Sequence, residues 1–153
     1  MAADGAAQEF RRHGRAVVVG ASLAGLRAAE ALREGGFTGS LTVIGDERHD
    51  PYDRPPLSKQ VLLGRISADD TALPRRRAID ARWRLGVAAA GLDLAERRVR
   101  LADGEEVEFD RLLIATGARA RPWFRETEAA LDGVFVLRTR EDAARLTRRL
   151  SAG

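Results

Sequence analysis

The sequence predicts an α/β fold, in which a parallel sheet with flanking helices carries an inserted antiparallel β-meander. Two stretches indicate this fold. Residues 16–47 have the pattern of a strand, a glycine-containing turn, a helix and a second strand, followed by two acidic residues. Further along, three short strand patterns over 87–109 precede a return to an apolar strand at 112–115. A chain of 153 residues is long enough for one domain with a real core.

The composition argues against several classes of protein. The first 14 residues lack the continuous apolar stretch of a secretory signal and predict a flexible lead-in. No apolar run approaches the ~18 residues of a membrane span, so the sequence predicts no membrane contact and, by default, a cytoplasmic location. Cysteine is absent and histidine occurs only at His13 and His49, which argues against disulfides and metal sites.

Basic residues are numerous, but the net charge is only +3. The sequence pI of about 10.4 is high because all but one of the 26 basic residues are Arg, whose pKa is very high. Arg75, Arg76 and Arg77 form the one dense basic run, without interleaved aromatic residues. We interpret it as a solvated helix start, with a docking patch as the alternative, and expect no nucleic-acid binding.

The first strand and turn have the residues of a phosphate-binding βαβ unit. The β-branched run 17–19 suits a strand buried on both faces of a parallel sheet. Gly20 allows a sharp turn, and Gly25 allows the following helix, about 23–34, to pack close to that strand. The free amides at the start of that helix favour a pyrophosphate. The candidate phosphate-binding residues are therefore Gly20, Ala21, Ser22, Leu23, Ala24 and Gly25.

Ser22 occupies the middle glycine position of the dinucleotide fingerprint, so the turn reads GxSxxG. We interpret its hydroxyl as an added donor to the phosphate, the alternative being a slightly displaced phosphate. Asp46 and Glu47 follow the second strand at 41–44, where a carboxylate would accept hydrogen bonds from the adenosine ribose. Asp46 is the preferred candidate and Glu47 its competitor. An ordinary turn without a ligand is the alternative for the whole unit.

The middle of the chain reads as a loop with two short helices. Three prolines within 45–58 predict irregular structure. Ser58 is predicted to cap a short helix that runs to about Leu63, and Pro74 to open another over about 75–82.

The second half of the chain is predicted to return to strands. The meander comprises strands at 87–94, 97–101 and 106–109, with a hairpin turn at Asp103-Gly104. The predicted elements after it are a buried apolar strand at 112–115, a strand at 134–137 and a helix at about 141–150.

Two segments carry a resemblance more specific than the glycine pattern. PYDRPPLSK at 51–59 and FDRLLIATG at 109–117 closely resemble NAD(P)H-dependent ferredoxin and rubredoxin reductases, which serve bacterial oxygenases and cytochromes P450. The resemblance covers roughly 16–150. It implies a Rossmann-like FAD-binding parallel sheet with an inserted β-meander, incomplete relative to the family. It also implies that 15–120 form the first segment of the FAD-binding domain and 121–153 a connection toward an NAD(P)H-binding domain.

The resemblance assigns further candidate FAD contacts. Lys59, the only lysine of the chain, resembles a lysine beside the isoalloxazine near N5, where a cation can favour the reduced flavin. Arg54 would face the FAD phosphates or the ring edge. A chance survivor of the bias toward Arg is the alternative for Lys59, and a surface ion pair with Asp50 or Asp53 the alternative for Arg54.

Other candidates rest mainly on the same resemblance. Ala115, Thr116 and Gly117 resemble the family's second FAD contact, Val87 the residue whose backbone meets the adenine edge, and Arg138 an FAD-contacting arginine. No general acid, base or nucleophile is expected in the protein, because flavin itself supplies the chemistry.

The resemblance implies a flavoprotein that passes electrons from NAD(P)H through FAD to a ferredoxin or rubredoxin. The family continues with an NAD(P)H-binding unit and further segments that this sequence lacks. We therefore expect the chain to need a C-terminal half or a complementing chain for activity. A non-catalytic module that associates with another protein is one alternative. An NAD-binding Rossmann protein without FAD is another, disfavoured by the segment 51–59.

Overall fold

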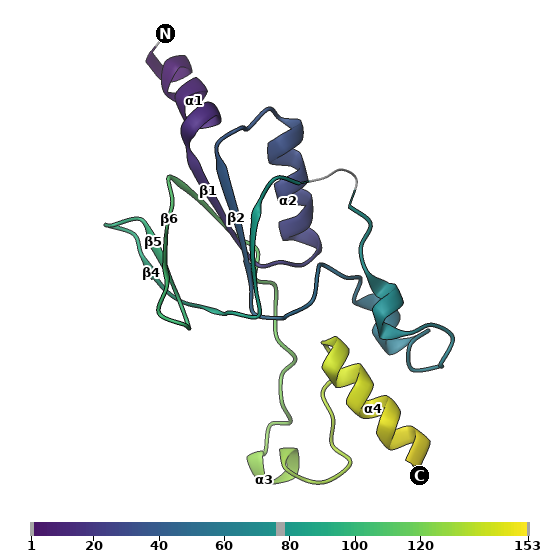
Figure 1. Cartoon of the computed structure of the whole chain (residues 1–153). Coiled ribbons are helices and arrows are strands. Elements are labelled where there is room, and N and C mark those ends of the chain that lie inside the picture. The colour runs from purple at the N-terminus through teal and green to yellow at the C-terminus, as the bar shows by residue number, and fades with distance from the viewer. Residues whose placement is uncertain (1, 76–78, 153) are drawn as a thin grey trace. The chain divides into compact units, whose positions relative to one another are not determined.

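The computed structural model describes residues 2–75 and 79–152 and divides into two compact units (Figure 1). The first, here called the sheet unit, comprises Met1–Pro51 and Leu73–Thr116. The second, here called the helical unit, comprises Tyr52–Ala72 and Gly117–Gly153. Each unit therefore contains segments from distant parts of the sequence.

The sheet unit is built on four parallel strands in the order β3-β2-β1-β7. Helix α2 connects β1 to β2 (Figure 1). The predicted strand–helix–strand pattern over 16–47 is confirmed, and the helix has the predicted bounds. The elements are β1 (Arg15–Val19), α2 (Leu23–Glu34), β2 (Ser40–Gly45), β3 (Arg82–Leu85) and β7 (Arg111–Ile114).

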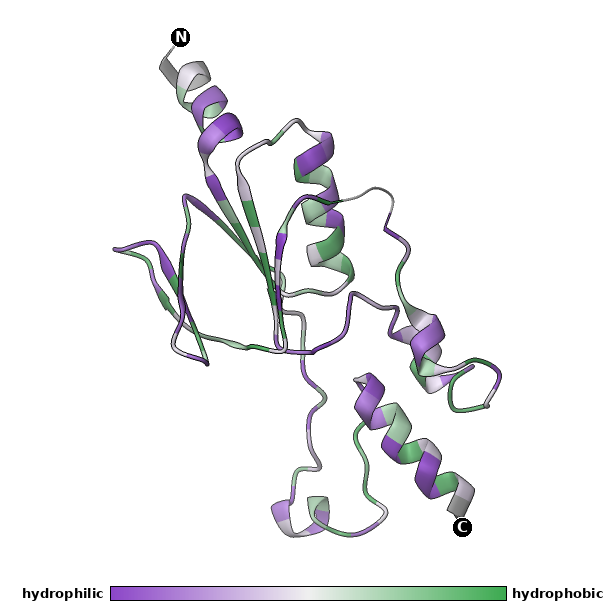
Figure 2. Cartoon of the chain, in the orientation of Figure 1, coloured by the Kyte–Doolittle hydropathy of each residue, from purple (hydrophilic) through white to green (hydrophobic). Residues whose placement is uncertain are grey.

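Strand β1 is buried on both faces, as its β-branched run predicts. On one face Ala16 and Val18 pack against Ala29 of α2. On the other, Val17 and Val19 join an apolar cluster that contains Val99, Leu101, Val107 and Phe109. Figure 2 shows the apolar colouring that runs along β1 and β2. Burial of both faces explains why this strand contains almost no polar side chain.

The antiparallel meander forms a separate three-stranded sheet in the order β4-β5-β6. Its strands are β4 (Ala89–Asp93), β5 (Arg98–Leu101) and β6 (Glu106–Glu108), shorter than predicted but at the predicted places. Gly104 has φ +89°, and its N–H donates to the carbonyl oxygen of Leu101 at 3.1 Å. The predicted α/β fold with an inserted meander is therefore confirmed.

The prediction of a helix over 75–82 is wrong in its last part. Residues 76–78 lie outside the described residues, 79–81 are irregular, and Arg82 begins β3. Strand β3 pairs in parallel with β2, Thr42 opposite Arg82. Arg75 does not start a helix: it donates to Asp50 at 2.7 Å, and its guanidinium lies 5.1 Å from the Trp83 ring centroid. Four residues give little sequence pattern from which to predict a strand, and the strand with which β3 pairs lies 40 residues earlier in the chain.

The prediction that strand 112–115 is buried is also wrong in the described structure. Strand β7 lies at one edge of the sheet, paired only with β1. Leu113 is 44% exposed and Ile114 63% exposed. An apolar run predicts burial only if other elements cover the strand, and the described residues do not cover its outer part.

Residues predicted as a flexible lead-in contain helix α1 (Ala2–His13). Phe10 anchors its last turns, with its ring centroid 5.2 Å from that of Phe37 and the Arg111 guanidinium 5.1 Å from it. The N–H of Thr38 donates to the carbonyl oxygen of Arg11 at 2.8 Å. The partners of this helix are distant in sequence, so its local composition did not indicate it.

The described residues of the helical unit form the 3₁₀ helices η1 (Pro55–Ser58) and η2 (Ala68–Thr71) and the α-helices α3 (Glu126–Ala129) and α4 (Arg140–Ala152). Its small apolar core consists of the buried residues Tyr52, Leu57, Val61 and Ala143. Helix α3 contributes no buried residue to it. The predicted C-terminal helix is confirmed.

Two predictions within this unit are wrong. The helix predicted to begin at Ser58 instead ends there, because Pro55 and Pro56 occupy its first positions, where a missing N–H costs nothing. Residues 59–63 form turns. Residues 134–137 are irregular rather than a strand, since no other strand among the described residues of this unit is available to pair with them.

Helix α4 begins with a reciprocal cap. The N–H of Thr139 donates to the Asp142 carboxylate at 2.9 Å, and the N–H of Asp142 donates to Thr139 Oγ1 at 3.1 Å. The N–H of Arg138 and the side chain of Arg145 donate to the same carboxylate. Burial opposes the charged form of Asp142, but these hydrogen bonds outweigh it and lower its pKa.

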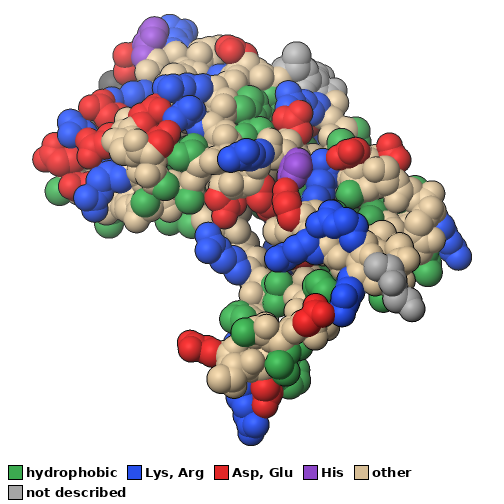
Figure 3. All heavy atoms as spheres, turned by 60° about the horizontal axis from the view of Figure 1, so that its bottom comes forward, with side chains coloured by type: hydrophobic (Ala, Val, Ile, Leu, Met, Phe, Trp, Pro, Cys, Tyr) green, Lys and Arg blue, Asp and Glu red, His purple; other side chains and the backbone are tan. Residues whose placement is uncertain are grey.

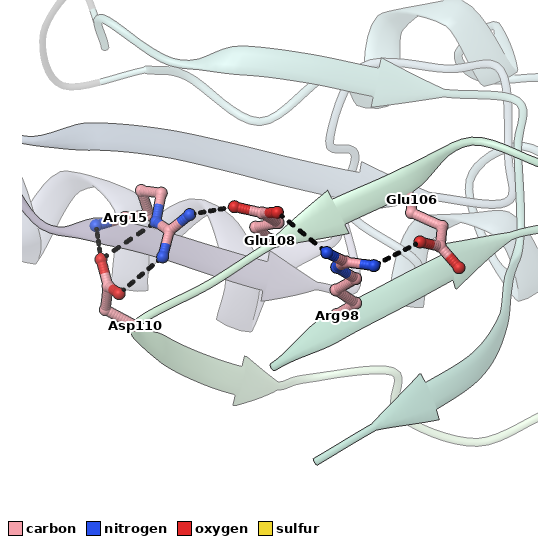
Figure 4. A network of polar contacts seen from close by, with 5 residues as sticks. All are labelled: Arg15, Arg98, Glu106, Glu108 and Asp110. Atoms are coloured by element: carbon pink, nitrogen blue, oxygen red, sulfur yellow. Dashed lines mark hydrogen bonds and ion pairs between the residues drawn. The ribbon is translucent and has the colours of Figure 1, made fainter. Parts of the chain in front are cut away.

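An ion-pair network joins the start of β1 to the start of β7 and to the meander (Figure 4). Asp110 accepts hydrogen bonds from the backbone N–H of Arg15 at 2.7 Å and from its guanidinium at 2.9 and 3.2 Å. Arg15 also pairs with Glu108, and Arg98 bridges Glu108 and Glu106. The hydrogen bonds from the Arg15 side chain and backbone lower the pKa of Asp110 to about 2.

We expect Asp110→Asn to lower the free energy of unfolding by about 1–2 kcal/mol near neutral pH, a value reduced for the partial exposure of the pair. Because the folded-state pKa lies below the unfolded one, this stabilisation is full above about pH 4 and is lost as the pH falls toward about 2. Urea titrations at several pH values measure it.

Glu106→Gln is the matched control at the outer end of the same network. Its pair with Arg98 is exposed, so the loss should stay below about 0.5 kcal/mol. Equal losses for the two variants, or a difference between wild type and Asp110→Asn that does not change with pH, would contradict the assignment to Asp110.

Candidate functional site

The predicted site residues of the sheet unit lie beyond the carboxyl ends of the parallel strands. Each group directly follows the carboxyl end of a strand: 20–25 after β1, Asp46 and Glu47 after β2, Val87 after β3, and Ala115 and Thr116 after β7. Open parallel sheets bind ligands outside these carboxyl ends, beside the strand at which the strand order reverses. Strand β1 has that position here, between β2 and β7.

Gly20 is required by the geometry of the turn after β1. Its φ is +120°, and a Cβ at this position would stand 2.1 Å from the carbonyl oxygen of Ala115. Its N–H donates to the carbonyl oxygen of Ile44 at 2.8 Å. A side chain is therefore excluded by conformation and by space together.

Gly25 is required by the packing of α2 on that turn. A Cβ at Gly25 would stand 1.8 Å from the carbonyl oxygen of Gly20 and 3.4 Å from Val18 Cγ1. This is the close approach of helix and strand that the sequence predicts for this glycine. The two glycines act on one feature, because the carbonyl of Gly20 occupies the space beside Gly25.

Sequence analysis missed a third glycine of this site, Gly45 at the end of β2. A Cβ at Gly45 would stand 2.6 Å from the Cβ of Ala21 in the turn after β1. Its carbonyl oxygen accepts the N–H of Val87 at 3.1 Å. The signal was available: a glycine directly before the acidic residues, at the end of a buried strand.

The start of α2 is arranged to receive an anion. Ser22 is the N-cap residue, and its side chain makes no capping hydrogen bond. The first turn of the helix contains no acidic residue. The first amides of a helix have no intrahelical acceptors and carry its partial positive charge. The hydroxyl of Ser22 is thus not used by the helix itself.

The two candidate ribose carboxylates differ in exposure. Asp46 is exposed and Glu47 half-buried. The carbonyl oxygen of Glu47 accepts the N–H of Gly86 at 2.9 Å, which ties the second residue of this acidic pair to the turn after β3. The preference for Asp46 as the ribose contact stays a prediction.

Three predicted residues of the helical unit lie close together. The Arg54 guanidinium donates from Nη1 to the carbonyl oxygen of Arg138 at 3.0 Å. The Arg138 side chain lies beside Gly117, with Nη2 3.4 Å from where a Cβ would stand, and Gly117 has φ +68°. The structure therefore brings Arg54 to the backbone of Arg138, and Gly117 to the Arg138 side chain.

Lys59, predicted to lie beside the flavin ring, is exposed at the end of η1. Its Nζ donates to the carbonyl oxygen of Pro55 at 3.4 Å, a long hydrogen bond. This contact leaves the side chain largely in solvent, and its role toward a flavin stays a prediction.

Three further features concern metal binding, membrane-spanning helices and surface charge. Within 2–75 and 79–152, no group of three or more His, Asp or Glu residues is placed to hold a metal ion. No helix in these ranges is both long and apolar enough to cross a membrane. On the face shown in Figure 3, Lys and Arg side chains are interspersed with Asp and Glu.

The family model of the pyridine nucleotide-disulphide oxidoreductases matches residues 14–152. The chain belongs to this family, and it is of the ferredoxin and rubredoxin reductase type. Members of the family bind FAD. The resemblance identified from the segments at 51–59 and 109–117 is confirmed.

Individual relatives are similar over most of this chain. The ferredoxin–NAD(+) reductase component of a p-cumate 2,3-dioxygenase system from Pseudomonas putida is 39% identical over 142 residues, which cover 90% of this chain and 34% of the relative. Rhodocoxin reductase from Rhodococcus erythropolis is 41% identical over 134 residues, which cover 86% and 31%. The chain thus spans about a third of the length of these relatives.

A solved structure gives the same proportion. The structure of a covalent complex between putidaredoxin reductase and putidaredoxin matches with a TM-score of 0.82 and 33% identity. The match covers 91% of this chain and 34% of that one. The fold is therefore that of part of a reductase.

We expect Gly20→Ala to destabilise the chain by at least about 2 kcal/mol more than Gly104→Ala. Both glycines have positive φ, so both substitutions strain the backbone, but a Cβ at Gly104 meets nothing within 4 Å. The difference isolates the collision with Ala115. Urea unfolding of both variants measures it, and equal losses would show that the turn is not in contact with the end of β7.

Proposed function

We propose that this chain forms part of the FAD site of an NAD(P)H-dependent reductase that passes electrons to the ferredoxin or rubredoxin of an oxygenase or P450 system. One observation carries the proposal. The strand ends of the sheet unit present a glycine turn, a helix start and acidic residues together, in a chain whose relatives are reductases of such systems. A dinucleotide needs this combination of groups.

The adenosine diphosphate half of FAD fits the sheet unit. In this proposal the amides at the start of α2 and the Ser22 hydroxyl bind the pyrophosphate, whose charge no acidic residue of the first turn opposes. Asp46, with Glu47 as the alternative, accepts hydrogen bonds from the ribose hydroxyls. The backbone of Val87, tied to Gly45 at the end of β2, meets the adenine edge.

The remaining predicted contacts would hold the flavin half. Ala115, Thr116 and Gly117 let the backbone pass close to the cofactor, and Arg54 and Arg138 supply cations near its phosphates or ring edge. Lys59 would favour the reduced, anionic ring. Bound FAD supplies hydride acceptance and one-electron transfer, so these residues bind and orient rather than move protons.

The activity of a complete reductase would require further polypeptide. The chain spans about a third of its relatives, and β7 exposes apolar side chains at an edge of the sheet. We propose that a C-terminal half or a complementing chain supplies the NAD(P)H site. The electron acceptor of the complete enzyme would be a ferredoxin or rubredoxin. The cytoplasmic location predicted from the sequence belongs to the same proposal.

We expect the chain alone to bind FAD weakly, with a shift of the visible flavin spectrum and partial quenching of flavin fluorescence. Asp46→Asn should weaken binding by about tenfold or more, because a charge-assisted hydrogen bond to the ribose is lost. Glu47→Gln should weaken it much less. Fluorescence titration of each variant with FAD measures these affinities.

Asp93→Asn, in the meander, is the control for a lost surface carboxylate and should bind FAD as the wild type does. No spectral change and no thermal shift with FAD would contradict the proposed cofactor. Binding of NADH but not FAD would favour the NAD-binding alternative. A larger effect of Glu47→Gln than of Asp46→Asn would exchange the roles of these two residues.

Co-expression with part of a relative tests whether activity requires further polypeptide. We expect the chain, co-expressed with the part of rhodocoxin reductase that it does not match, to yield a flavin-containing complex with NADH-dependent electron transfer to rhodocoxin. Neither half should show this activity alone. A stable complex without flavin would instead favour a non-catalytic module that associates with another protein.

A further inference from the structure

In the helical unit, the predicted residue Arg54 and a second arginine without a predicted role both lie against the ring of Tyr52. Tyr52, the only tyrosine of the chain, is 4% exposed, and Arg140 is 9% exposed. The Arg54 guanidinium carbon lies 5.1 Å from the Tyr52 ring centroid and the Arg140 guanidinium carbon 4.5 Å from it. A single aromatic ring thus attracts two arginines.

Hydrogen bonds fix the orientation of Arg54. Its Nη1 donates to the Tyr52 hydroxyl oxygen at 3.1 Å and to the carbonyl oxygen of Arg138 at 3.0 Å. The carbonyl of Arg138 is itself held in place, because the adjacent N–H groups of Arg138 and Thr139 donate to Asp142 in the cap of α4. Arg54 stays half-buried, so part of it faces solvent.

Arg140, which also lies against the Tyr52 ring, is held by contacts of its own. Its Nε and Nη2 donate to Thr71 Oγ1 at 3.3 and 3.1 Å, and the Asp69 carboxylate lies 3.8 Å from its Nη1. The N–H of Asp53 donates to the carbonyl oxygen of Thr71 at 2.8 Å, which joins the Tyr52 segment to the same place. Three separate parts of the chain therefore meet around this ring.

The position of Arg140 is unfavourable for a purely structural residue. It is the first residue of α4, where the partial positive charge of the helix disfavours a cation, and it is buried. An apolar residue could fill this space without either disadvantage. The guanidinium adds what an apolar residue would not: hydrogen bonds to Thr71 and a cation against the Tyr52 ring, which together hold that ring in place.

We infer that Tyr52 and Arg140 are positioning residues that orient the Arg54 guanidinium for an anionic group of FAD. This inference rests on the proposed function. An arginine already fixed in its binding conformation loses less side-chain freedom when the ligand arrives. The contacts of Arg54 and Arg140 with the Tyr52 ring would thereby raise affinity for the cofactor, although neither Tyr52 nor Arg140 is assigned a contact with it.

A double-mutant cycle tests the inference with FAD. Tyr52→Phe keeps the ring and removes the hydroxyl, and should weaken FAD binding by about fivefold. In an Arg54→Gln background the same substitution should have almost no further effect, because there is no guanidinium left to orient. Equal effects in both backgrounds would mean that Tyr52 acts on the fold alone and would overturn the inference.

Arg140 variants give an independent test. Arg140→Met should weaken FAD binding, and Arg140→Lys should restore part of it, because an ammonium keeps the cation over the ring but not the paired donors to Thr71. Phe124→Leu removes an exposed cation–aromatic contact with Arg125 in the same unit and should leave binding unchanged. Failure of lysine to restore any binding lost in Arg140→Met would count against the role of the cation.

The orientation of Arg54 can also be measured without FAD. The side-chain NH signals of Arg54 in ¹⁵N NMR spectra should show slow exchange and restricted motion in the wild type and lose both in Tyr52→Phe. Unchanged Arg54 signals would overturn the inference even if FAD binds. If the wild type shows the ordered signals but binds no FAD, the proposed function fails while the positioning of Arg54 by Tyr52 stands.

Discussion

The carbonyl oxygen of Ala115 stands where a side chain at position 20 would begin, and the carbonyl oxygen of Gly20 stands where a side chain at position 25 would begin. This chain of close contacts holds the end of β7, the turn after β1 and the first turn of α2 together. The hydrogen bond from Gly20 to Ile44 extends it to β2. The predicted contacts at 20–25, at Asp46 and Glu47 and at Ala115 and Thr116 are placed by strands and turns that these contacts join, and Val87 is tied to the same place by its hydrogen bond to Gly45.

At the opposite end of the same strands, a charged pair is added to the backbone contacts. Asp110 binds both the backbone and the side chain of Arg15, at the starts of β7 and β1. The two kinds of contact suit their locations. Ion pairs at the strand starts are partly exposed and tolerate water, whereas in the proposed FAD site the strand ends leave the amides of α2 and the Ser22 hydroxyl for the cofactor.

The sequence predicted the βαβ unit well because its signals are local. The β-branched run of β1, the glycines at 20 and 25, and the composition of α2 are each sufficient within a few residues. Strand β3 and the packing of Phe10 on Phe37 were missed because both depend on partners far along the chain. The exposure of β7 was missed for a related reason, because an apolar sequence does not show whether another element covers the strand.

The candidate site shows the same division at the level of single residues. Gly20 and Gly25 were predicted from the sequence because a fingerprint records their backbone requirement. Gly45 belongs to no such fingerprint, and although it stands beside the acidic residues in the sequence, the contact with Ala21 that requires it is seen only in the structure. Arg54 was predicted by resemblance, but its contacts with Tyr52 and the carbonyl of Arg138, and the contact of Arg140 with Tyr52, depend on segments that meet only in the folded chain. A binding residue is therefore easier to recognise in a sequence than the residues that orient it, because a ligand constrains the first directly and the second only through the fold.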